Sequence, residues 1–148
     1  MKLPLIPESY NYDNWVRLEW DSVEDVAIGS LVNKTISVIE GMKRGSKIVA
    51  FGCTDGTVFY MHHVRDCCES VDIEDIVGDV TDLIGTTILT ANENVSKGGS
   101  DEECATWTAT HYDIATIKGS VTIRWYGSSN SYYSESVDFS ILKSSITQ

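Results

Sequence analysis

The sequence predicts a mainly β protein, at the margin of the α+β class, with one or two short helices. An antiparallel sheet folded as a sandwich or an open barrel is the expected architecture. Several runs alternate polar and apolar residues and are rich in Thr, Val, Ile, Tyr and Trp, which suit a pleated, half-buried surface. An Asp55-Gly56 pair between two such runs predicts a hairpin. The runs follow one another through short connections, as in antiparallel sheets.

The first half of the chain supplies three expected strands. Polar and apolar residues alternate from Thr35, and glycines at both ends of 41–45 indicate a turn. The next two strands are expected over 48–51 and 58–64, on either side of a tight turn at 53–56.

The middle of the chain has a different period. A short helix is expected within 71–84, because its apolar residues are spaced by two, three, four and four: Val71, Ile73, Ile76, Val80 and Ile84. Strand character returns over 86–94. Residues 95–103 predict a polar loop, since Gly, Ser and acidic residues dominate that segment.

The last third predicts two long strands, at 106–117 and 120–126, a turn at 127–131 and a final strand at 132–141. On the second of these, Val121, Ile123 and Trp125 should face one side. Arg124 and Tyr126 should face the other. The aromatic residues expected in the core are Trp107, Trp125 and Phe139.

With 148 residues, the chain is long enough for one domain with a real core. Residues 1–30 are irregular but rich in Tyr and Trp, so we expect an N-terminal extension that packs on the domain. Residues 31–148 are expected to form a single β-rich domain. The sequence leaves the oligomeric state open.

The net charge of −11 limits the classes of partner. Non-specific nucleic-acid binding requires Lys and Arg to displace counterions, so no direct nucleic-acid partner is expected. Anionic membranes are excluded for the same reason, and no apolar run is long enough to span a bilayer. Strong acidity favours attraction to basic protein surfaces.

The cysteines indicate a reducing compartment. The short apolar stretch at residues 3–7 is followed at once by Glu8, so it does not read as a secretory signal. Adjacent Cys67 and Cys68 bridge each other only with strain. We therefore expect four reduced thiols in a cytoplasmic protein.

Catalytic and metal chemistry are weighed at His62, His63, Cys67 and Cys68. Adjacent side chains on a strand point to opposite faces, which does not suit a closed zinc site, so a buried thiol beside a hydrogen-bonded histidine is preferred. A cysteine nucleophile paired with histidine is a second alternative, but Asp66 and Glu69 oppose thiolate formation. No catalytic residue, metal or cofactor is assigned, and the protein is not expected to be an enzyme.

Two segments are candidates for binding. One is the acidic run from Asp66 to Asp82, which contains no Lys or Arg. If it is helical, Asp75, Asp79 and Asp82 share one face. The other is the turn and aromatic stretch from Arg124 to Ser134. The candidate binding residues are Arg65, Asp66, Glu69, Asp75, Asp79, Asp82, Arg124, Tyr126, Asn130, Tyr132 and Tyr133.

Several short motifs are distinctive: Asp66-Cys67-Cys68-Glu69-Ser70-Val71, Glu74-Asp75-Ile76, Gly78-Asp79, Thr106-Trp107-Thr108, Ala115-Thr116, Lys118-Gly119-Ser120-Val121-Thr122-Ile123-Arg124-Trp125, and Ser129-Asn130 with Tyr132-Tyr133-Ser134. Together, over roughly residues 30–141, they resemble an uncharacterised family of small bacteriophage proteins. Ala109-Thr110 replaces an aromatic pair usual in that family, and Asn130-Ser131 replaces Asn-Gly.

The resemblance implies phage origin and action in the cytoplasm of the host bacterium, and it supplies no agreed activity. We expect stoichiometric binding of a host protein with a basic surface, plausibly a defence or nucleic-acid-handling factor that is inhibited. One alternative is sequestration of a small ligand such as a signalling nucleotide, by Arg124, Trp125, Tyr132, Tyr133 and the loop around Arg65. Another is a minor virion component.

Overall fold

The fold is described from a computed structural model, which covers residues 4–8, 10, 22–65, 67–100, 105–130 and 133–146. Its elements are β1 Val23–Asp25, η2 Ile28–Leu31, β2 Ile36–Glu40, β3 Ile48–Cys53, β4 Val58–His62, β5 Ser70–Val77, η3 Val80–Leu83, β6 Thr90–Ser100, β7 Ala105–Thr116, β8 Gly119–Ser129, β9 Asp138–Leu142 and η4 Lys143–Ser145.

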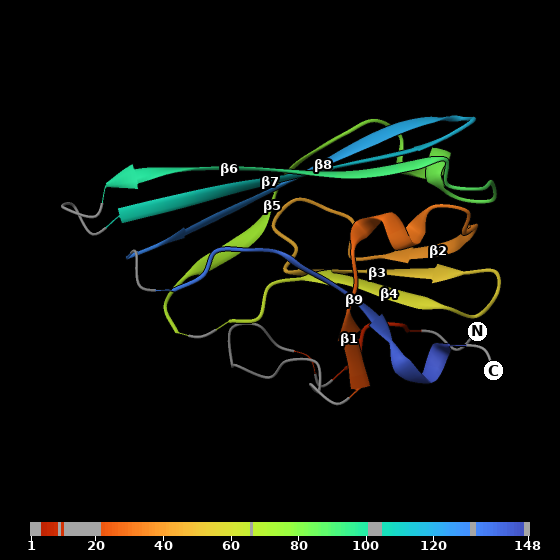
Figure 1. The fold of residues 1–148 in the computed structure, drawn as a ribbon, viewed down its shortest axis with the longest axis horizontal. Helices are drawn as coiled ribbons and strands as arrows, with labels where there is room; N and C mark the ends of the chain where they lie inside the picture. Colours follow the sequence, from red (N-terminus) through yellow and green to blue (C-terminus); the bar gives the residue numbers. More distant parts are fainter. Residues whose placement is uncertain are drawn as a thin grey trace.

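Two antiparallel sheets form the molecule (Figure 1). The first sheet has the order β1-β9-β4-β3-β2, and the second has the order β5-β8-β7-β6. The predicted β sandwich is confirmed, and the sheets do not close into a barrel. Helix among the described residues is limited to short 3-10 turns, namely η2, η3, η4 and Ser22 before β1, and none of these could cross a membrane.

The main core lies between the sheets. Phe51 and Phe59 of the first sheet pack with Phe139, and Trp125 of the second sheet is fully buried with them. The Trp125 Nε1–H donates to the sulfur of Met61 across the sandwich at 3.0 Å. The expected core positions of Trp125 and Phe139 are therefore confirmed.

The first sheet is covered on its outer face as well. Ala50 and Tyr60 are buried there, in a second cluster that includes Leu5. The Tyr60 hydroxyl donates to the Leu5 carbonyl at 2.7 Å, and the Leu5 N–H donates to Glu40 at 2.7 Å. Leu5 thus covers part of this outer face.

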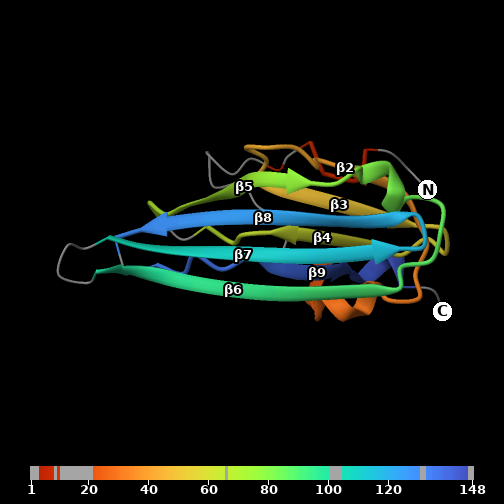
Figure 2. The same ribbon diagram turned by 90° about the horizontal axis from the view of Figure 1, so that it is seen from above.

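The second sheet differs because its strands β6, β7 and β8 are long and run side by side past the end of the first sheet (Figures 1 and 2). We call the face turned away from the first sheet the outer face. Side chains along it on β8, from Ser120 to Ser128 at alternate positions, are exposed or half-buried. The outer face of the second sheet is therefore the place to look for a site.

The predicted helix within 71–84 is wrong. Residues 70–77 form β5, and the register against β8 shifts by one residue between Ile73 and Asp75. This bulge lets both Ile73 and Ile76 point inward although three positions separate them. The apolar spacing of a bulged strand was therefore taken for that of a helix.

Three further boundaries differ from the prediction. The expected polar loop at 95–103 is strand β6 as far as Ser100, because pairing with β7, and not burial, holds it extended. The expected turn at 127–131 is the end of β8 as far as Ser129. The last strand begins at Asp138, and the described residues 133–137 precede it outside any strand, since pairing with β1 and β4 begins only at β9.

Candidate functional site

Two aromatic rings lie stacked on the outer face of the second sheet. Trp107 of β7 and Tyr126 of β8 have ring centroids 6.3 Å apart and planes inclined by 18°. Both side chains are half-buried, so part of each ring is open to solvent. We call this pair the aromatic platform.

The platform corrects the prediction that Trp107 lies in the core. Along β7 the inward positions are even-numbered, as Tyr112 and Ile114 show, so Trp107 necessarily points outward. Its indole lies across Gly98 of β6, where an added Cβ would come within 2.5 Å of the ring. Glycine at that position leaves the room that the indole occupies.

A shallow hollow of about 560 Å³ adjoins the platform. Its lining is mostly small and uncharged: Cys68, Ser70, Gly99, Ala105, Thr106, Trp107, Tyr126, Ser128, Ser129 and Asn130. No Lys or Arg lines it among the described residues. The hollow can therefore offer ring faces, hydroxyls and an amide, but it offers no cation for a phosphate.

The charged side chains around the platform form ion pairs. Asp72 lies directly opposite Tyr126 on β5, with the Lys47 ammonium 3.5 Å from its carboxylate. Arg124, the next outward residue on β8, has its Nε 3.3 Å from the Glu74 carboxylate. The net charge of −11 on the whole chain, and not these ion pairs, favours a cationic group above the rings, where a guanidinium can stack.

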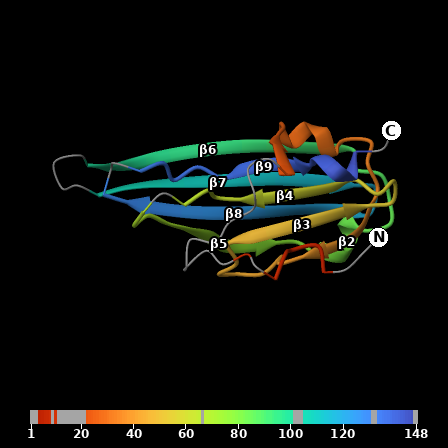
Figure 3. The same ribbon diagram turned by 90° about the horizontal axis from the view of Figure 1, so that it is seen from below.

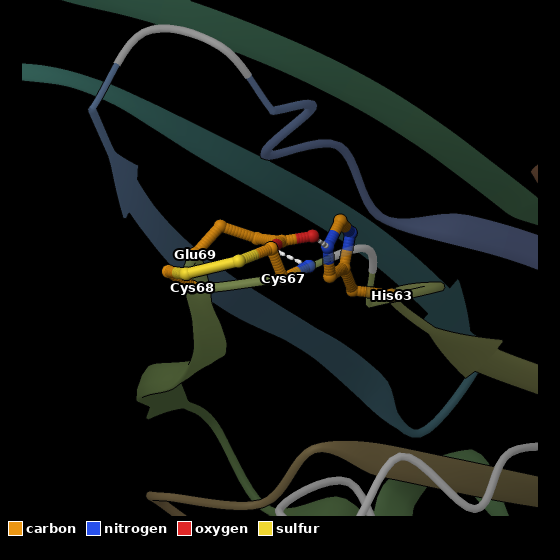
Figure 4. The surroundings of a disulfide bond; sticks show 4 residues. All are labelled: His63, Cys67, Cys68 and Glu69. Atoms are coloured by element: carbon orange, nitrogen blue, oxygen red, sulfur yellow. Dashed lines mark hydrogen bonds and ion pairs between the residues drawn. A yellow bond between two sulfur atoms is a disulfide. The ribbon is translucent and has the colours of Figure 1, made fainter.

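A buried histidine–carboxylate pair fixes the loop beside the hollow (Figure 4). His63 follows β4 and Glu69 precedes β5; their side chains are 2% and 0% exposed, and the Nε2–Oε2 distance is 2.8 Å. Glu69 also accepts the Cys67 N–H at 2.8 Å. Glu69 therefore serves the interior and is not a surface residue.

The hydrogen bonds define the protons of this pair. The Nδ1 of His63 lies 2.6 Å from the Ser136 carbonyl oxygen, which can only accept, so Nδ1 carries a hydrogen. The contact between Nε2 and Glu69 then needs one further proton, held by either group. Because both ring nitrogens form hydrogen bonds, His63 links the end of β4 to the loop before β5 and to the segment before β9.

A second buried carboxylate braces the far end of the second sheet. Glu135 accepts hydroxyl hydrogen bonds from Thr106 at 2.7 Å and Thr108 at 2.8 Å, and another from Ser129. Gly127 permits this approach, because an added Cβ there would lie 2.9 Å from the Glu135 backbone. The segment before β9 is thereby held under the end of β8 that carries the hollow.

The thiols do not form the expected set. Cys67 and Cys68 are joined as a disulfide, so the prediction of four reduced cysteines is wrong for this pair (Figure 4). Cys53 is free, and burial raises the pKa of its thiol to about 11, which keeps it protonated. Cys104 lies outside the described residues.

The acidic run does not form one helical face. Asp75 lies on β5 with its carboxylate 2.7 Å from Arg44, and Asp79 accepts the Thr81 N–H at 3.0 Å as the cap of η3. Asp82 lies within η3, close to Gly119. The three carboxylates thus lie on β5, at the N-cap of η3 and within η3, and they do not share one helical face.

The other predicted binding residues divide between the hollow and its surroundings. Asn130 lines the hollow and Tyr126 forms half of the platform. Tyr133 lines a second hollow of about 260 Å³ with Lys97 and Glu135, and Trp107 borders both hollows. Arg65 is half-buried in the loop after β4. Asp66 and Tyr132 lie outside the described residues, and Trp125 is buried away from any ligand.

No group of three or more possible metal ligands occurs within the described ranges. His62 and His63 have different hydrogen-bond partners. His62 Nε2 contacts the Ser140 hydroxyl at 3.1 Å, whereas His63 contacts Ser136 and Glu69.

Comparisons with known proteins agree with an uncharacterised family. A family model described as a domain of unknown function, DUF7448, matches residues 29–139. No curated protein and no solved structure matches the chain. The matched region runs from η2 to the start of β9 and includes the platform, the hollow and both buried carboxylates. The chain belongs to the DUF7448 family.

Proposed function

We propose that the protein acts without catalysis, by stoichiometric binding of a protein partner through the outer face of the second sheet. The observation that carries this proposal is the stacked, half-buried pair Trp107 and Tyr126 on that face. Binding hot spots are enriched in Trp, Tyr and Arg, and Arg124 extends the same face. The adjoining hollow is shallow, which suits an inserted side chain of a partner.

The partner should present a basic surface. An excess of eleven negative charges attracts such a surface over long range and speeds encounter. An arginine of the partner would stack on the platform, within reach of Asp72. The acidic residues Asp75 and Asp79 then act mainly in steering, because exposed charges contribute little to tight contact.

The phage origin implied by the sequence resemblance gives this proposal a setting. A basic partner in the host cytoplasm is, on this proposal, a defence or nucleic-acid-handling protein, whose own basic surface would otherwise contact phosphates. Occupying that surface with an acidic protein would inhibit the factor, which is a counter-defence role.

Capture from a host-cell lysate followed by calorimetry with the purified partner tests the proposal. Trp107→Ala and Tyr126→Ala should each weaken binding by about thirtyfold, as expected for a hot spot of about 2 kcal/mol. Ile117→Ala, at a 79% exposed residue remote from the platform, serves as the control. Wild-type affinity in both platform variants would refute this assignment of the surface.

Charge reversal separates steering from contact. Replacing Asp75, Asp79 and Asp82 with Lys should slow association and reduce its dependence on salt, while dissociation stays the same. An unchanged association rate would show that the acidic run is only a solvated surface.

The volume of the hollow favours one alternative, a small ring-shaped ligand. The lack of a lining cation favours an uncharged nucleoside or sugar over a nucleotide. Thermal shift measurements with nucleosides, nucleotides and simple sugars test this, since a bound ligand stabilises the fold. Stabilisation that disappears in Trp107→Ala would favour the ligand over the protein partner.

A further inference from the structure

The strand β6 is a long edge strand. All eleven of its residues pair with β7, and it is the last strand of the second sheet. Within the described part of the chain, no segment other than β7 forms a backbone hydrogen bond with it. Figures 2 and 3 show it along one margin of the sheet. Such an edge is a template for another strand.

The opposite edge of the same sheet is closed, which makes the contrast informative. At β5, the Gly45 N–H donates to the Ile73 carbonyl at 2.8 Å, and the Ile73 N–H donates to the Ser46 carbonyl at 3.0 Å. The loop between β2 and β3 therefore covers the β5 edge. At the other edge, η2 lies close to β6 but forms no backbone hydrogen bond with it among the described residues. The fold therefore pairs the β5 edge with its own chain, whereas the outward backbone groups of β6 have no such partner in the described part of the chain.

Three side chains on β6 form a symmetric pattern. Glu93, Val95 and Lys97 alternate along the strand and so lie on one face. Val95 is 49% exposed, and neither Glu93 nor Lys97 forms an ion pair with any residue that the structure describes. Lys97 is the sole cation between Arg65 and Lys118 in the sequence. An acidic and a basic residue thus lie at equal distances on either side of an exposed valine.

We propose that β6 pairs with β6 of a second copy of this chain, antiparallel about a two-fold axis through Val95. The two second sheets then form one continuous sheet. Val95 lies against Val95 of the second copy, and each Glu93 lies directly opposite a Lys97. Directly opposed residues on one face are close enough for an ion pair, and a two-fold axis makes each contact twice.

The charges select this register over its neighbours. A pair centred on Glu93 would oppose two carboxylates, and one centred on Lys97 would oppose two ammonium groups, both of which are unfavourable. A centre at Asn94 would place Glu93 opposite Val95 and leave Lys97 without a carboxylate. Only the axis at Val95 satisfies both charges.

The local field around Glu93 also favours a cation from outside. Glu93 lies opposite Tyr112, whose pKa is raised by burial and then by this carboxylate. The pKa of Asp138 is raised by burial and further by Asp25 and Glu93. An incoming Lys97 would offset the negative charge that these carboxylates share.

Sedimentation across a range of protein concentrations tests the proposal with four forms of the full chain. The wild type, of 16.4 kDa, should form a dimer as concentration rises. Glu93→Lys and Lys97→Glu each oppose like charges and should weaken the dimer at least tenfold. The double variant E93K/K97E restores opposite charges and should recover it. Glu24→Lys, an exposed reversal on β1, is the matched control and should dimerise as the wild type does.

Mixing gives the decisive result. Glu93→Lys and Lys97→Glu are each weak alone, but together they oppose two lysines to two glutamates, so a mixed dimer should form. Circular dichroism establishes that each variant is folded, which separates a lost interface from a lost fold. The proposal is overturned if the wild type stays monomeric at hundreds of micromolar. A dimer that all the variants preserve, or folded single variants that do not associate on mixing, would overturn it as well.

Discussion

The same substitution on the two faces of one sheet should have opposite consequences for stability and binding. Trp107 and Trp125 lie on adjacent strands of the second sheet, but Trp125 is fully buried and Trp107 is half-exposed on the outer face. Replacing each with alanine removes an equal volume. The difference in outcome therefore reports the environment alone.

For Trp125→Ala we expect a loss of about 3–5 kcal/mol in the free energy of unfolding, the usual range for a fully buried aromatic. The indole N–H bond to Met61 is lost in addition to the packing. In a domain of this length, each kcal/mol corresponds to about 2–4 °C, so the midpoint should fall by roughly 6–20 °C. Trp125→Phe should lie between this variant and the wild type.

For Trp107→Ala the expected loss is about 1 kcal/mol. The substitution removes the stack with Tyr126, worth about 0.5–1.5 kcal/mol, and uncovers Gly98. Its midpoint should therefore fall by about 2–4 °C, while binding of the proposed partner weakens by about thirtyfold.

Urea unfolding followed by far-ultraviolet circular dichroism measures both values on one scale. Equal destabilisation by the two substitutions would contradict the placement of Trp107 on an open face. The aromatic platform would then be part of the core, and the proposed function would lose the observation on which it rests, the solvent-accessible Trp107–Tyr126 pair.

Three further predictions concern buried groups. Burial lowers the pKa of His62 from 6.5 to about 4, so on acidification the unfolded chain takes up a proton on this histidine before the folded chain does. The free energy of unfolding should therefore fall as the pH drops from 6.5 toward 4, by up to about 3 kcal/mol. Urea titrations at several pH values should show a smaller dependence on pH for His62→Gln. Glu69→Ala should cost about 3–5 kcal/mol because it removes the carboxylate that contacts the His63 Nε2 and accepts the Cys67 N–H, whereas Glu74→Ala, at an exposed pair, should cost less than about 1 kcal/mol by the same assay. Denaturing thiol titration should find two thiols before reduction and four after it, given the Cys67–Cys68 pair; four before reduction would restore the expectation from sequence.

The sequence was most informative where one face of a strand is buried. The alternation of Val121, Ile123 and Trp125 with Arg124 and Tyr126 predicted both faces of β8, and the structure agrees. The hairpin between β3 and β4 followed from Asp55-Gly56, and Gly56 has the positive φ of 90° that such a turn requires. In these strands and this turn, the sequence pattern agrees with the burial and backbone conformation that the fold imposes.

Prediction failed where pairing, bulges or distant partners determine the conformation. The strand β6 carries no apolar alternation because both of its faces are exposed, so only its partner β7 holds it extended. The bulge between Ile73 and Asp75 imitated helical spacing, as described above. Gly127 and Ser128 resemble a turn in isolation, but the need for space beside Glu135 explains the glycine within a strand.

The candidate site shows the same division. Tyr126 and Asn130 were expected as binding residues, and both border the hollow. Trp107 was expected in the core, although its parity with His111 and Asp113 on β7 indicates the outward face. The buried role of Glu69 depends on His63 and so on the return of the chain after β4, which no local pattern encodes.

The two proposals have a joint geometric consequence. A two-fold axis perpendicular to a continuous sheet keeps both outer faces on one side, so a dimer through β6 would present both aromatic platforms in the same direction. A partner with two copies of its basic site could then be held by both platforms, and the second contact would form at a high effective concentration. Glu93→Lys would weaken the binding of such a bivalent partner without changing a residue that lines either hollow, whereas a partner with a single site would bind this variant as it binds the wild type. The difference between these two responses separates the function of the platform from the function of the edge.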